Sequence, residues 1–269
     1  MDGAILPHNQ RASAVWSAGG QDYDAISRSI GDALEHAVQR LHASAGQHVL
    51  DLATGTGWTS RLLARIGVRV TGADIAQELL QSARERAALE GLAIDYRTGD
   101  AESLPFADAS FDHVISTFGV MFASRPQIAA DELARICKPG GRLALTTWLP
   151  DSAVVKMFGI MRPYMPPPPP PAPPSPFEWG RRDRLQELLG AHFDLKFEEG
   201  VNFQREVDGE TAWKQASTSY GPTKMLATHL EPVQREALKK DFIVFIEGCR
   251  TELGITVPRG YLVTIGTRR

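Results

Sequence analysis

Cysteine is scarce in this sequence, and an excess of basic charge is absent. Its 269 residues include only two cysteines, Cys137 and Cys249, which excludes a disulfide framework and a four-thiolate zinc site. Lysine and arginine number 29 against 32 aspartates and glutamates, so the formal net charge is −3. Because a dedicated nucleic-acid binder normally carries a basic excess or a basic stripe, we expect no nucleic-acid partner.

Long hydrophobic runs are also absent. Nowhere do roughly 18 apolar residues follow one another without a charge, so we expect no membrane-spanning helix. The first residues, MDGAILPHNQ, lack the basic start and apolar run of a secretory signal. With 43% hydrophobic and 23% charged residues, the composition is typical of a globular chain. We therefore predict a soluble cytoplasmic protein.

Strand-like and helix-like patterns alternate through the first part of the chain. Short apolar runs predict strands at residues 47–52, 68–73, 94–98, 113–116 and 142–148. Helical spacing of apolar residues predicts helices at residues 58–66, 77–90 and 127–137. We interpret Lys138-Pro-Gly-Gly141 as a strong breaker. Five β-then-α units of this kind predict an α/β fold with a doubly wound, mainly parallel sheet.

Prolines divide this regular part from the rest of the chain. Ten of the 18 prolines lie between Pro163 and Pro176, where neither a helix nor a central strand can persist. The stretch predicts a stiff polyproline II segment, which either straps the sheet edge or binds a polyproline-recognising partner. We expect one domain with an arm and first helix at 1–44, a core at 45–150, a proline-rich strap at 151–180 and late strands at 181–269.

The last part of the chain mixes strands and helices. The pattern predicts a helix at 182–190, a strand within 193–207, largely helical structure at 210–247 and a final strand at 260–267. A helical insertion, at about 209–257, thus separates two late strands. Such insertions commonly form a lid over a pocket.

Three short motifs follow the predicted strands. VLDLATGTG, from Val49 to Gly57, runs from a strand through a glycine turn into a helix, where a ligand can approach bare backbone and free N–H groups. A strand-to-helix turn that binds no ligand would have the same sequence pattern. Asp74 ends the next strand, and its carboxylate either accepts two ribose hydroxyls or caps the following helix. Asp100 and Ala101 follow a third strand, where they either meet an adenine ring or form a turn and cap.

Taken together, these motifs resemble the class I S-adenosylmethionine-dependent methyltransferases. The resemblance is closest to the small-molecule branch that includes the ubiquinone and menaquinone biosynthesis methyltransferases. It is carried by VLDLATGTG, Asp74, GDAESLPFADASFDHVIS and ELARICKPGGRLALTT, within about residues 49–148. The resemblance implies a Rossmann-like, seven-stranded sheet with an antiparallel last strand, which GYLVTIGT at 260–267 would supply. The core at 45–150 would then bind the cofactor.

The resemblance also implies a set of site residues. The family's first motif glycine is Ala53 here, a variant familiar in this branch, and its last is Thr59. By position, the methionine moiety is surrounded by Asp51, Ala53, Gly55 and Gly57. Asp74 binds the ribose, and the adenine meets Ile75, Asp100 and Ala101. Thr117 and Phe118 face the sulfonium. No metal site is expected.

Residues outside the motifs could complete the pocket. Trp16 and Tyr23 would either cover the sulfonium, with the gain of a cation near an aromatic face, or dock an amino-terminal arm on the core. We expect this segment to order on cofactor binding. Val120 and Met121 are candidates for a substrate wall or for core packing, and Tyr220 is a candidate substrate contact.

The leading interpretation is an S-adenosylmethionine-dependent methyltransferase that moves a methyl group to a small-molecule acceptor by in-line displacement and releases S-adenosylhomocysteine. The catalytic residue stays unassigned because a general base is optional for this chemistry. One alternative is an NAD(P)-dependent oxidoreductase, although Trp58 and Ser60 stand where a third glycine is expected. Another is a non-catalytic scaffold that binds the adenosyl cofactor. The sequence leaves open whether the chain forms a homodimer.

Overall fold

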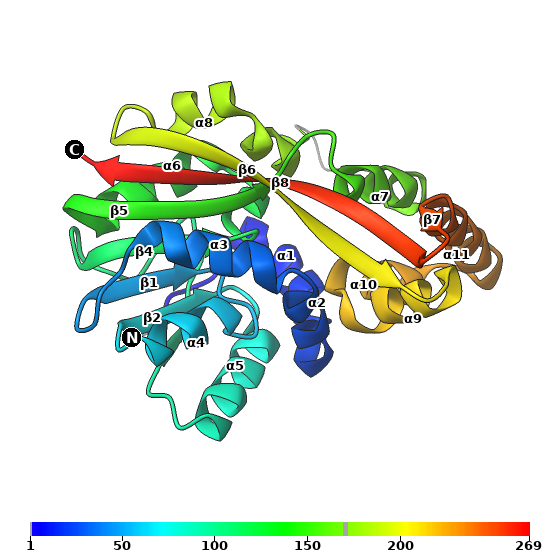
Figure 1. The fold of residues 1–269 in the computed structure, drawn as a ribbon, viewed down its shortest axis with the longest axis horizontal. Coiled ribbons are helices and arrows are strands. Elements are labelled where there is room, and N and C mark those ends of the chain that lie inside the picture. Colours follow the sequence, from blue (N-terminus) through cyan, green and yellow to red (C-terminus); the bar gives the residue numbers. More distant parts are fainter. Residues whose placement is uncertain (1, 169–171) are drawn as a thin grey trace.

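The protein is built around one mixed β-sheet, seen in a computed structural model that describes residues 2–168 and 172–269 (Figure 1). The strand order is β3-β2-β1-β4-β5-β8-β6, and a short β7 pairs with β8 outside this path. The strands are β1 (His48–Leu52), β2 (Arg69–Asp74), β3 (Asp95–Thr98), β4 (Phe111–Thr117), β5 (Cys137–Trp148), β6 (Phe193–Glu206), β7 (Arg250–Thr251) and β8 (Gly254–Arg268).

Helices cover both faces of the sheet and extend beyond one end of it. They are α1 (Gln10–Ser17), α2 (Asp24–Ser29), α3 (Gly31–Leu41), α4 (Trp58–Arg65), α5 (Gln77–Leu89), α6 (Pro126–Ile136), α7 (Ala153–Met161), α8 (Arg182–Leu189), α9 (Gly209–Ser219), α10 (Gly221–His229) and α11 (Pro232–Glu247). The seven strands of the main path confirm the predicted α/β, doubly wound fold.

Strands β1 to β5 are parallel, and their central members are buried on both faces. Successive strand residues point to opposite sides, so a strand between two helical layers must be apolar at nearly every position. Val49 packs in a cluster with Leu41 of α3 and Leu63 of α4, whereas its neighbour Leu50 belongs to a cluster that includes Leu133 of α6. This double burial explains the short continuous apolar runs in the sequence.

Strand β8 runs antiparallel to both of its neighbours, β5 and β6. It begins at Gly254, six residues before the predicted strand at 260–267, and it pairs with β6 over the whole length of that strand. The two strands therefore project beyond the parallel part of the sheet as a ribbon (Figure 1). Helices α9 and α11 pack with the ribbon in a second apolar cluster that includes Trp213, Phe242 and Val257.

Two local expectations were wrong. Lys138-Pro-Gly-Gly141 does not separate a helix from a strand, because β5 begins at Cys137 and runs through it. The pairing with β4 shifts between Phe111 and His113, so the extra residues bulge out of the sheet while the strand continues. Between β3 and β4 the chain forms turns instead of the helix that a fifth β-then-α unit requires, and Pro105 within it disfavours a helix.

The proline-rich stretch is anchored on its carboxyl side. Polyproline II was predicted from Pro163 to Pro176. The central residues 169–171 lie outside the described residues, and at the start of the stretch Arg162–Tyr164 forms a 3-10 turn instead. A 3-10 turn, Pro176–Gly180, buries Trp179, whose carbonyl oxygen accepts a hydrogen bond of 2.9 Å from Thr147 Oγ1 of β5. A Cβ at Gly180 would lie 2.0 Å from the Trp148 carbonyl oxygen, so only glycine allows this close approach.

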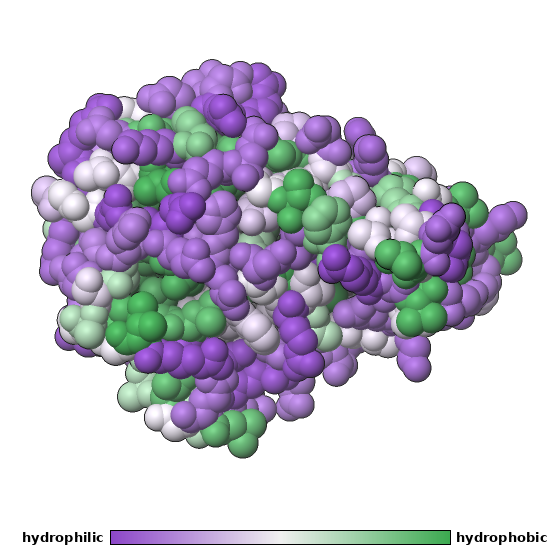
Figure 2. All heavy atoms as spheres, in the orientation of Figure 1, coloured by the Kyte–Doolittle hydropathy of each residue, from purple (hydrophilic) through white to green (hydrophobic). Residues whose placement is uncertain are grey.

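The surface carries scattered apolar side chains among charged ones. The face seen in Figure 2 is mostly hydrophilic, and large exposed apolar residues such as Leu89 and Leu253 lie far apart in the sequence. Single exposed apolar residues of this kind are ordinary on protein surfaces. None of the described helices has the length and apolarity needed to cross a membrane.

Candidate active site

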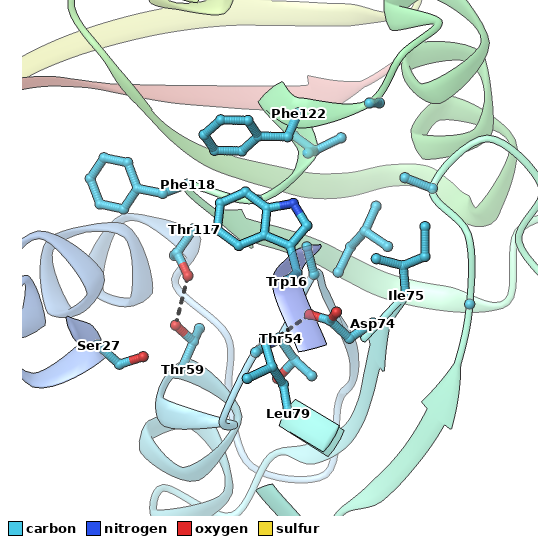
Figure 3. A pocket seen from close by; sticks show the side chains of 18 of the residues that line it. Trp16, Ser27, Thr54, Thr59, Asp74, Ile75, Leu79, Thr117, Phe118 and Phe122 are labelled. Atoms are coloured by element: carbon cyan, nitrogen blue, oxygen red, sulfur yellow. Dashed lines mark hydrogen bonds between the residues drawn. The ribbon is translucent and has the colours of Figure 1, made fainter. Parts of the chain in front are cut away.

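A cavity of about 970 Å³ lies at the carboxyl ends of β1, β2, β3 and β4 (Figure 3). In open α/β sheets this edge is the usual ligand site, because loops from adjacent strands diverge there. The predicted site residues that line the cavity are Ala53, Gly55, Asp74, Ile75, Asp100, Ala101, Thr117 and Phe118, together with Trp16, Tyr23 and Val120.

The loop after β1 exposes its backbone to this cavity. Ala53, Gly55 and Gly57 all have positive φ angles, of 56°, 57° and 77°. A Cβ on Gly55 would meet only Tyr23 Cε1, at 3.8 Å, so this glycine borders open space. A Cβ on Gly57 would lie 2.2 Å from Tyr96 Oη, which shows that Gly57 is required for packing. Gly57 does not line the cavity.

Asp74 combines burial with spare hydrogen-bonding capacity. Its side chain accepts hydrogen bonds of 2.8 Å from the backbone N–H groups of Gly55 and Ala76, and it lines the cavity. Burial raises its pKa to about 6, against the opposing effect of these bonds. It does not cap α5, whose N-cap is Ala76. An ionised carboxylate offers about four lone-pair sites, so two stay available for ribose hydroxyls.

Asp51, predicted to lie near the methionine moiety, is fully buried beneath the loop and does not line the cavity. One of its oxygens accepts hydrogen bonds from Thr54 Oγ1 at 2.6 Å and Ser60 Oγ at 2.7 Å. Burial, aided by the nearby Asp74 charge, raises its pKa to about 6. Asp51 therefore shapes the loop from behind, through Thr54, which does line the cavity.

Asp100 lines the cavity, but its carboxylate binds the amino-terminal arm. Its oxygens accept hydrogen bonds from Asn9 Nδ2 at 3.0 and 3.1 Å, from the Leu6 N–H at 3.1 Å and from the Glu102 N–H at 3.0 Å. These four contacts use its whole accepting capacity, so an adenine amino group would have to displace one. Asn9 itself lines the cavity, a contribution that no sequence motif signalled.

Thr117 and Phe118 close the cavity at the end of β4. Thr117 Oγ1 lies 3.0 Å from Thr59 Oγ1 of α4, and Figure 3 shows both hydroxyls at the cavity wall. Phe118 has a φ of 59°, unusual for a non-glycine residue, and stacks on Trp148 with ring centroids 3.9 Å apart. Strained backbone of this kind costs about 1–3 kcal/mol and tends to cluster at ligand sites.

Comparison with known proteins identifies the family. The model of the family described as "Methyltransferase domain" matches residues 50–145. An uncharacterized protein of Mycobacterium tuberculosis is 38% identical over 187 residues, which cover 69% of this chain and 68% of that protein. The chain belongs to the class I S-adenosylmethionine-dependent methyltransferases. Its cofactor is S-adenosylmethionine, which leaves as S-adenosylhomocysteine, and the oxidoreductase alternative is wrong.

Two further similarities agree with this assignment. The ubiquinone/menaquinone biosynthesis C-methyltransferase of Roseobacter denitrificans is 35% identical over 161 residues, which cover 56% of this chain and 64% of that enzyme. The crystal structure of the YcgJ protein from Bacillus subtilis superimposes with a TM-score of 0.63 at 20% identity, covering 89% of this chain and 99% of YcgJ. At that identity, the second similarity shows a shared fold alone.

The residues at the cavity fit the cofactor of this methyltransferase. The bare backbone at Gly55 leaves room for a ligand, and Asp74 beside it keeps acceptor sites for hydroxyl donors. Within the described residues, no group of three or more His, Cys, Asp or Glu side chains could hold a metal ion. The roles of individual side chains toward the cofactor stay predictions.

Aromatic side chains from four separate segments meet over the methyltransferase cavity. Trp16 of α1 lies edge-to-face with Phe122, at 4.9 Å between centroids, and with Tyr220, at 5.9 Å. Tyr23 stacks with Tyr220 at 6.3 Å. Burial raises the pKa of both tyrosines, so their phenol groups stay neutral near pH 7. Figure 3 shows the Trp16 ring between Phe122 and Asp74.

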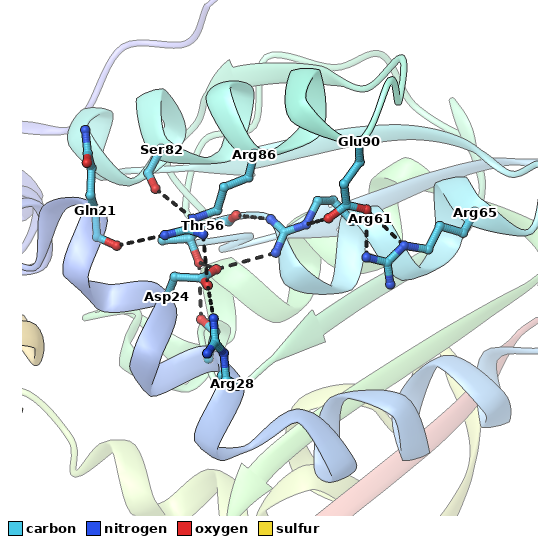
Figure 4. A network of polar contacts seen from close by, with 10 residues as sticks. Gln21, Asp24, Arg28, Thr56, Arg61, Arg65, Ser82, Arg86 and Glu90 are labelled. Carbon is cyan, nitrogen blue, oxygen red and sulfur yellow. Dashed lines mark hydrogen bonds and ion pairs between the residues drawn. The ribbon is translucent and has the colours of Figure 1, made fainter.

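A buried charge network holds this aromatic segment against the core (Figure 4). Asp24, which follows Tyr23, pairs with Arg86 of α5 at 3.1 Å and with Arg61 of α4 at 3.4 Å, and accepts a hydrogen bond from Thr56 Oγ1 at 3.2 Å. Arg61 also donates to the Thr56 carbonyl oxygen at 2.6 Å. The network thus connects α2 to the glycine loop and places Tyr23 beside the cavity.

A second cavity, of about 700 Å³, adjoins the first. The two share Trp16, Tyr23, Ile30, Phe118 and Phe122. The remaining wall is mostly apolar and comes from α2, β5, α7, β6, α9 and the residue that follows it, α11 and β8. It is formed by Trp148, Val154, Met157, Ala212, Ala216, Tyr220 and Phe242, with Ile26, Ser29, Gln204, Gln215 and Arg259. Tyr220 was a predicted substrate contact, whereas Met121 is fully buried and lines neither cavity.

Proposed function

We propose that this methyltransferase acts on an apolar, aromatic small molecule that binds in the second cavity. The observation that carries the proposal is the shared aromatic wall, since Phe118 and Phe122 line both the cofactor cavity and the second one. An acceptor lying against this wall has its reactive atom directed toward the methyl donor. Aromatic side chains provide large apolar contact areas of defined geometry, which suit a flat ring.

The residues around the two cavities align the reactants and exclude water. S-adenosylmethionine supplies a methyl group on a sulfonium sulfur; the sulfur keeps the electron pair of the broken bond while the acceptor atom provides the pair for the new one. Gly55 and Asp74 hold the adenosyl end, and Trp16, Phe118 and Phe122 surround the reacting end. Correct alignment of two reactants can contribute about 7–11 kcal/mol of barrier reduction.

The proton of the acceptor leaves without a dedicated base among the described residues, because the carboxylates that line the first cavity, Asp74 and Asp100, belong to the proposed adenosyl end. Neither cavity is lined by a histidine or a lysine in the part of the chain that the structure describes, and burial keeps Tyr23 and Tyr220 neutral by raising their pKa values. We therefore infer an acceptor that ionises readily by itself, such as a phenol or an enol. The name of the Roseobacter relative, which refers to quinone biosynthesis, supports an aromatic acceptor class.

A methyl-transfer assay tests this acceptor class. The purified protein is incubated with methyl-labelled S-adenosylmethionine and one acceptor at a time: 1-naphthol, catechol or 1,4-naphthohydroquinone against sarcosine or ethanolamine. We expect label transfer to the aromatic acceptors because only they fill the apolar wall. Preferential methylation of the small amines would contradict the proposal.

A cavity-filling variant locates the acceptor. Ala216→Phe places a ring in the second cavity, so the KM for the aromatic acceptor should rise at least tenfold while the affinity for S-adenosylhomocysteine stays unchanged. Ala227→Phe is the matched control, because Ala227 is similarly buried in the same helical region but lines neither cavity. An unchanged KM in Ala216→Phe would place the acceptor elsewhere.

A further inference from the structure

Among the described residues that line the second cavity, Arg259 is the one cation in a mostly apolar wall. Arg259 of β8 is 7% exposed and lines this cavity opposite the helices of the insertion. Building on the proposed function, we propose that the acceptor carries a carboxylate that pairs with Arg259. Among aromatic acceptors, the cavity should therefore prefer an acid over a neutral compound of the same shape.

Every hydrogen-bond partner of Arg259 is a neutral oxygen. Its Nε donates to Asn202 Oδ1 at 2.7 Å, and its terminal nitrogens donate to the Ser29 carbonyl oxygen at 2.6 Å and to Gln204 Oε1 at 3.2 Å. Among the described residues, no carboxylate lies within ion-pair distance of it. Two acids, Asp32 and Glu206, are near enough to act electrostatically on Arg259, but they accept hydrogen bonds from the side-chain amides of Asn202 and Gln204 and not from the guanidinium.

Arg61, which is also deeply buried, has carboxylate partners that compensate its charge. Arg61, 4% exposed, pairs with Glu90 at 3.0 Å and with Asp24 at 3.4 Å. A buried guanidinium without a direct ion-pair partner is costly, and here burial lowers the pKa of Arg259 to about 10, against the opposing effect of the Asp32 and Glu206 charges. A ligand carboxylate would displace a neutral acceptor such as Gln204 Oε1, at 3.2 Å, and form the direct ion pair that the protein lacks; guanidinium–carboxylate pairs are strong and geometrically specific.

The place of Arg259 relative to the cofactor cavity sets the shape of the acceptor. The guanidinium lies over the Trp148 ring, 5.9 Å from its centroid, and Trp148 in turn stacks on Phe118 at 3.9 Å. Phe118 borders the cofactor cavity, so the cation is separated from that cavity by two stacked rings. An aromatic acid can lie along these rings, with its carboxylate at Arg259 and its nucleophilic atom toward the methyl donor.

The charge preference of the cavity is tested with three probes of one shape. Binding of 2-naphthoate, 2-naphthamide and 2-naphthylmethylammonium is measured by titration calorimetry on the full chain saturated with S-adenosylhomocysteine. We expect 2-naphthoate to bind at least tenfold more tightly than the amide and the ammonium probe to bind most weakly. Equal affinity for acid and amide would overturn the carboxylate proposal and leave the aromatic acceptor standing. Binding of none of the probes would reject both.

Substitutions at Arg259 test whether this residue causes the preference of the cavity for the acid over the amide. Arg259→Gln should bind the acid and the amide equally, whereas Arg259→Lys should recover part of the preference for the acid. The matched control is Arg268→Gln, because Arg268 lies on the same strand, lies over a phenyl ring and donates to backbone carbonyls, but lines neither cavity.

Two outcomes would identify Arg259 as a structural clamp only. One is a wild-type preference for the acid that persists in Arg259→Gln. The other is an equal loss of this preference in Arg259→Gln and in Arg268→Gln. If Arg259→Gln does not fold, the acid-against-amide comparison on the wild-type protein still decides whether the cavity selects an anion.

Discussion

The two cavities of this methyltransferase are built in different ways. The first cavity, where we expect the cofactor, is formed mainly by loops after four neighbouring strands, and its polar lining includes the backbone of the glycine loop, Asp74, Asp100 and Asn9. The second cavity is formed by side chains from segments as distant as α1 and β8. From this difference we expect cofactor binding to depend on backbone conformation at the sheet edge, and acceptor selection to depend on how separate elements pack.

Phe118 is the structural link between these regions. It lines both cavities, stacks on Trp148 and holds a positive φ. Substitutions in the glycine loop should therefore change cofactor affinity alone, substitutions on the helices of the insertion should change acceptor affinity alone, and substitution of Phe118 should change both.

The largest effect is expected from Gly55→Val. The new side chain would project toward the cofactor cavity from a residue with a φ of 57°, so the affinity for S-adenosylhomocysteine should fall at least 100-fold in titration calorimetry. Gly91→Val is the control, since Gly91 has a similar φ of 66° but lies away from both cavities. Normal cofactor binding by Gly55→Val would show that the loop is only a turn.

The next largest effect is a pH dependence of S-adenosylhomocysteine affinity that we expect from Asp74. Burial raises its pKa to about 6, and ribose hydroxyls donate best to the ionised form. Lowering the pH below about 6 protonates this carboxylate in the free protein, so the affinity for S-adenosylhomocysteine should decrease as the pH falls, by up to about tenfold per unit.

Asp74→Asn should weaken S-adenosylhomocysteine binding at pH 7.5 by about 10- to 100-fold, the scale of one or two lost charge-assisted hydrogen bonds. It should also flatten the pH dependence near pH 6, which titration calorimetry at pH 5 to 8 would measure. Persistence of the same pH profile in Asp74→Asn would assign it to another group, with Asp51 as the nearest candidate.

A smaller effect on both regions is expected from Phe118→Leu. Leucine removes the ring face that Phe118 presents to both cavities, and an aromatic contact is worth about 0.5–1.5 kcal/mol, so both S-adenosylhomocysteine and acceptor should bind about two- to tenfold more weakly. Phe193→Leu serves as the control, because Phe193 is fully buried outside both cavities. A change confined to one ligand would argue against a shared wall.

The smallest effect is expected from Ala53→Gly. Ala53 has a φ of 56°, where an L-residue is strained, but glycine costs more backbone entropy on folding. The two effects largely offset each other, so the free energy of unfolding should rise by less than about 1 kcal/mol with unchanged cofactor affinity. Chemical denaturation measures this, and a clear loss of stability would show that the Ala53 methyl group has a packing role.

Sequence patterns predicted the strands and helices of the core closely, because doubly buried strands require continuous apolar runs. At Lys138-Pro-Gly-Gly141 the turn-forming residues predicted a break in regular structure. Pairing with β4 overrides this local preference, so β5 continues through these residues with a bulge. The motif also could not show that Asp51 and Gly57 lie behind the cavity wall, since residues in one tight loop can face opposite sides.

Asn9 and Arg259 illustrate the limit of sequence patterns. Neither residue belongs to a motif, and their contacts join segments far apart in the chain: Asn9 with Asp100, and Arg259 with Ser29 and Asn202. The periodicity and the glycine spacing of the sequence alone determined the wound sheet and the position of the cofactor loop, because both depend on local backbone preferences. Only the tertiary structure decided the second cavity and its cation, because long-range packing alone brings those side chains together.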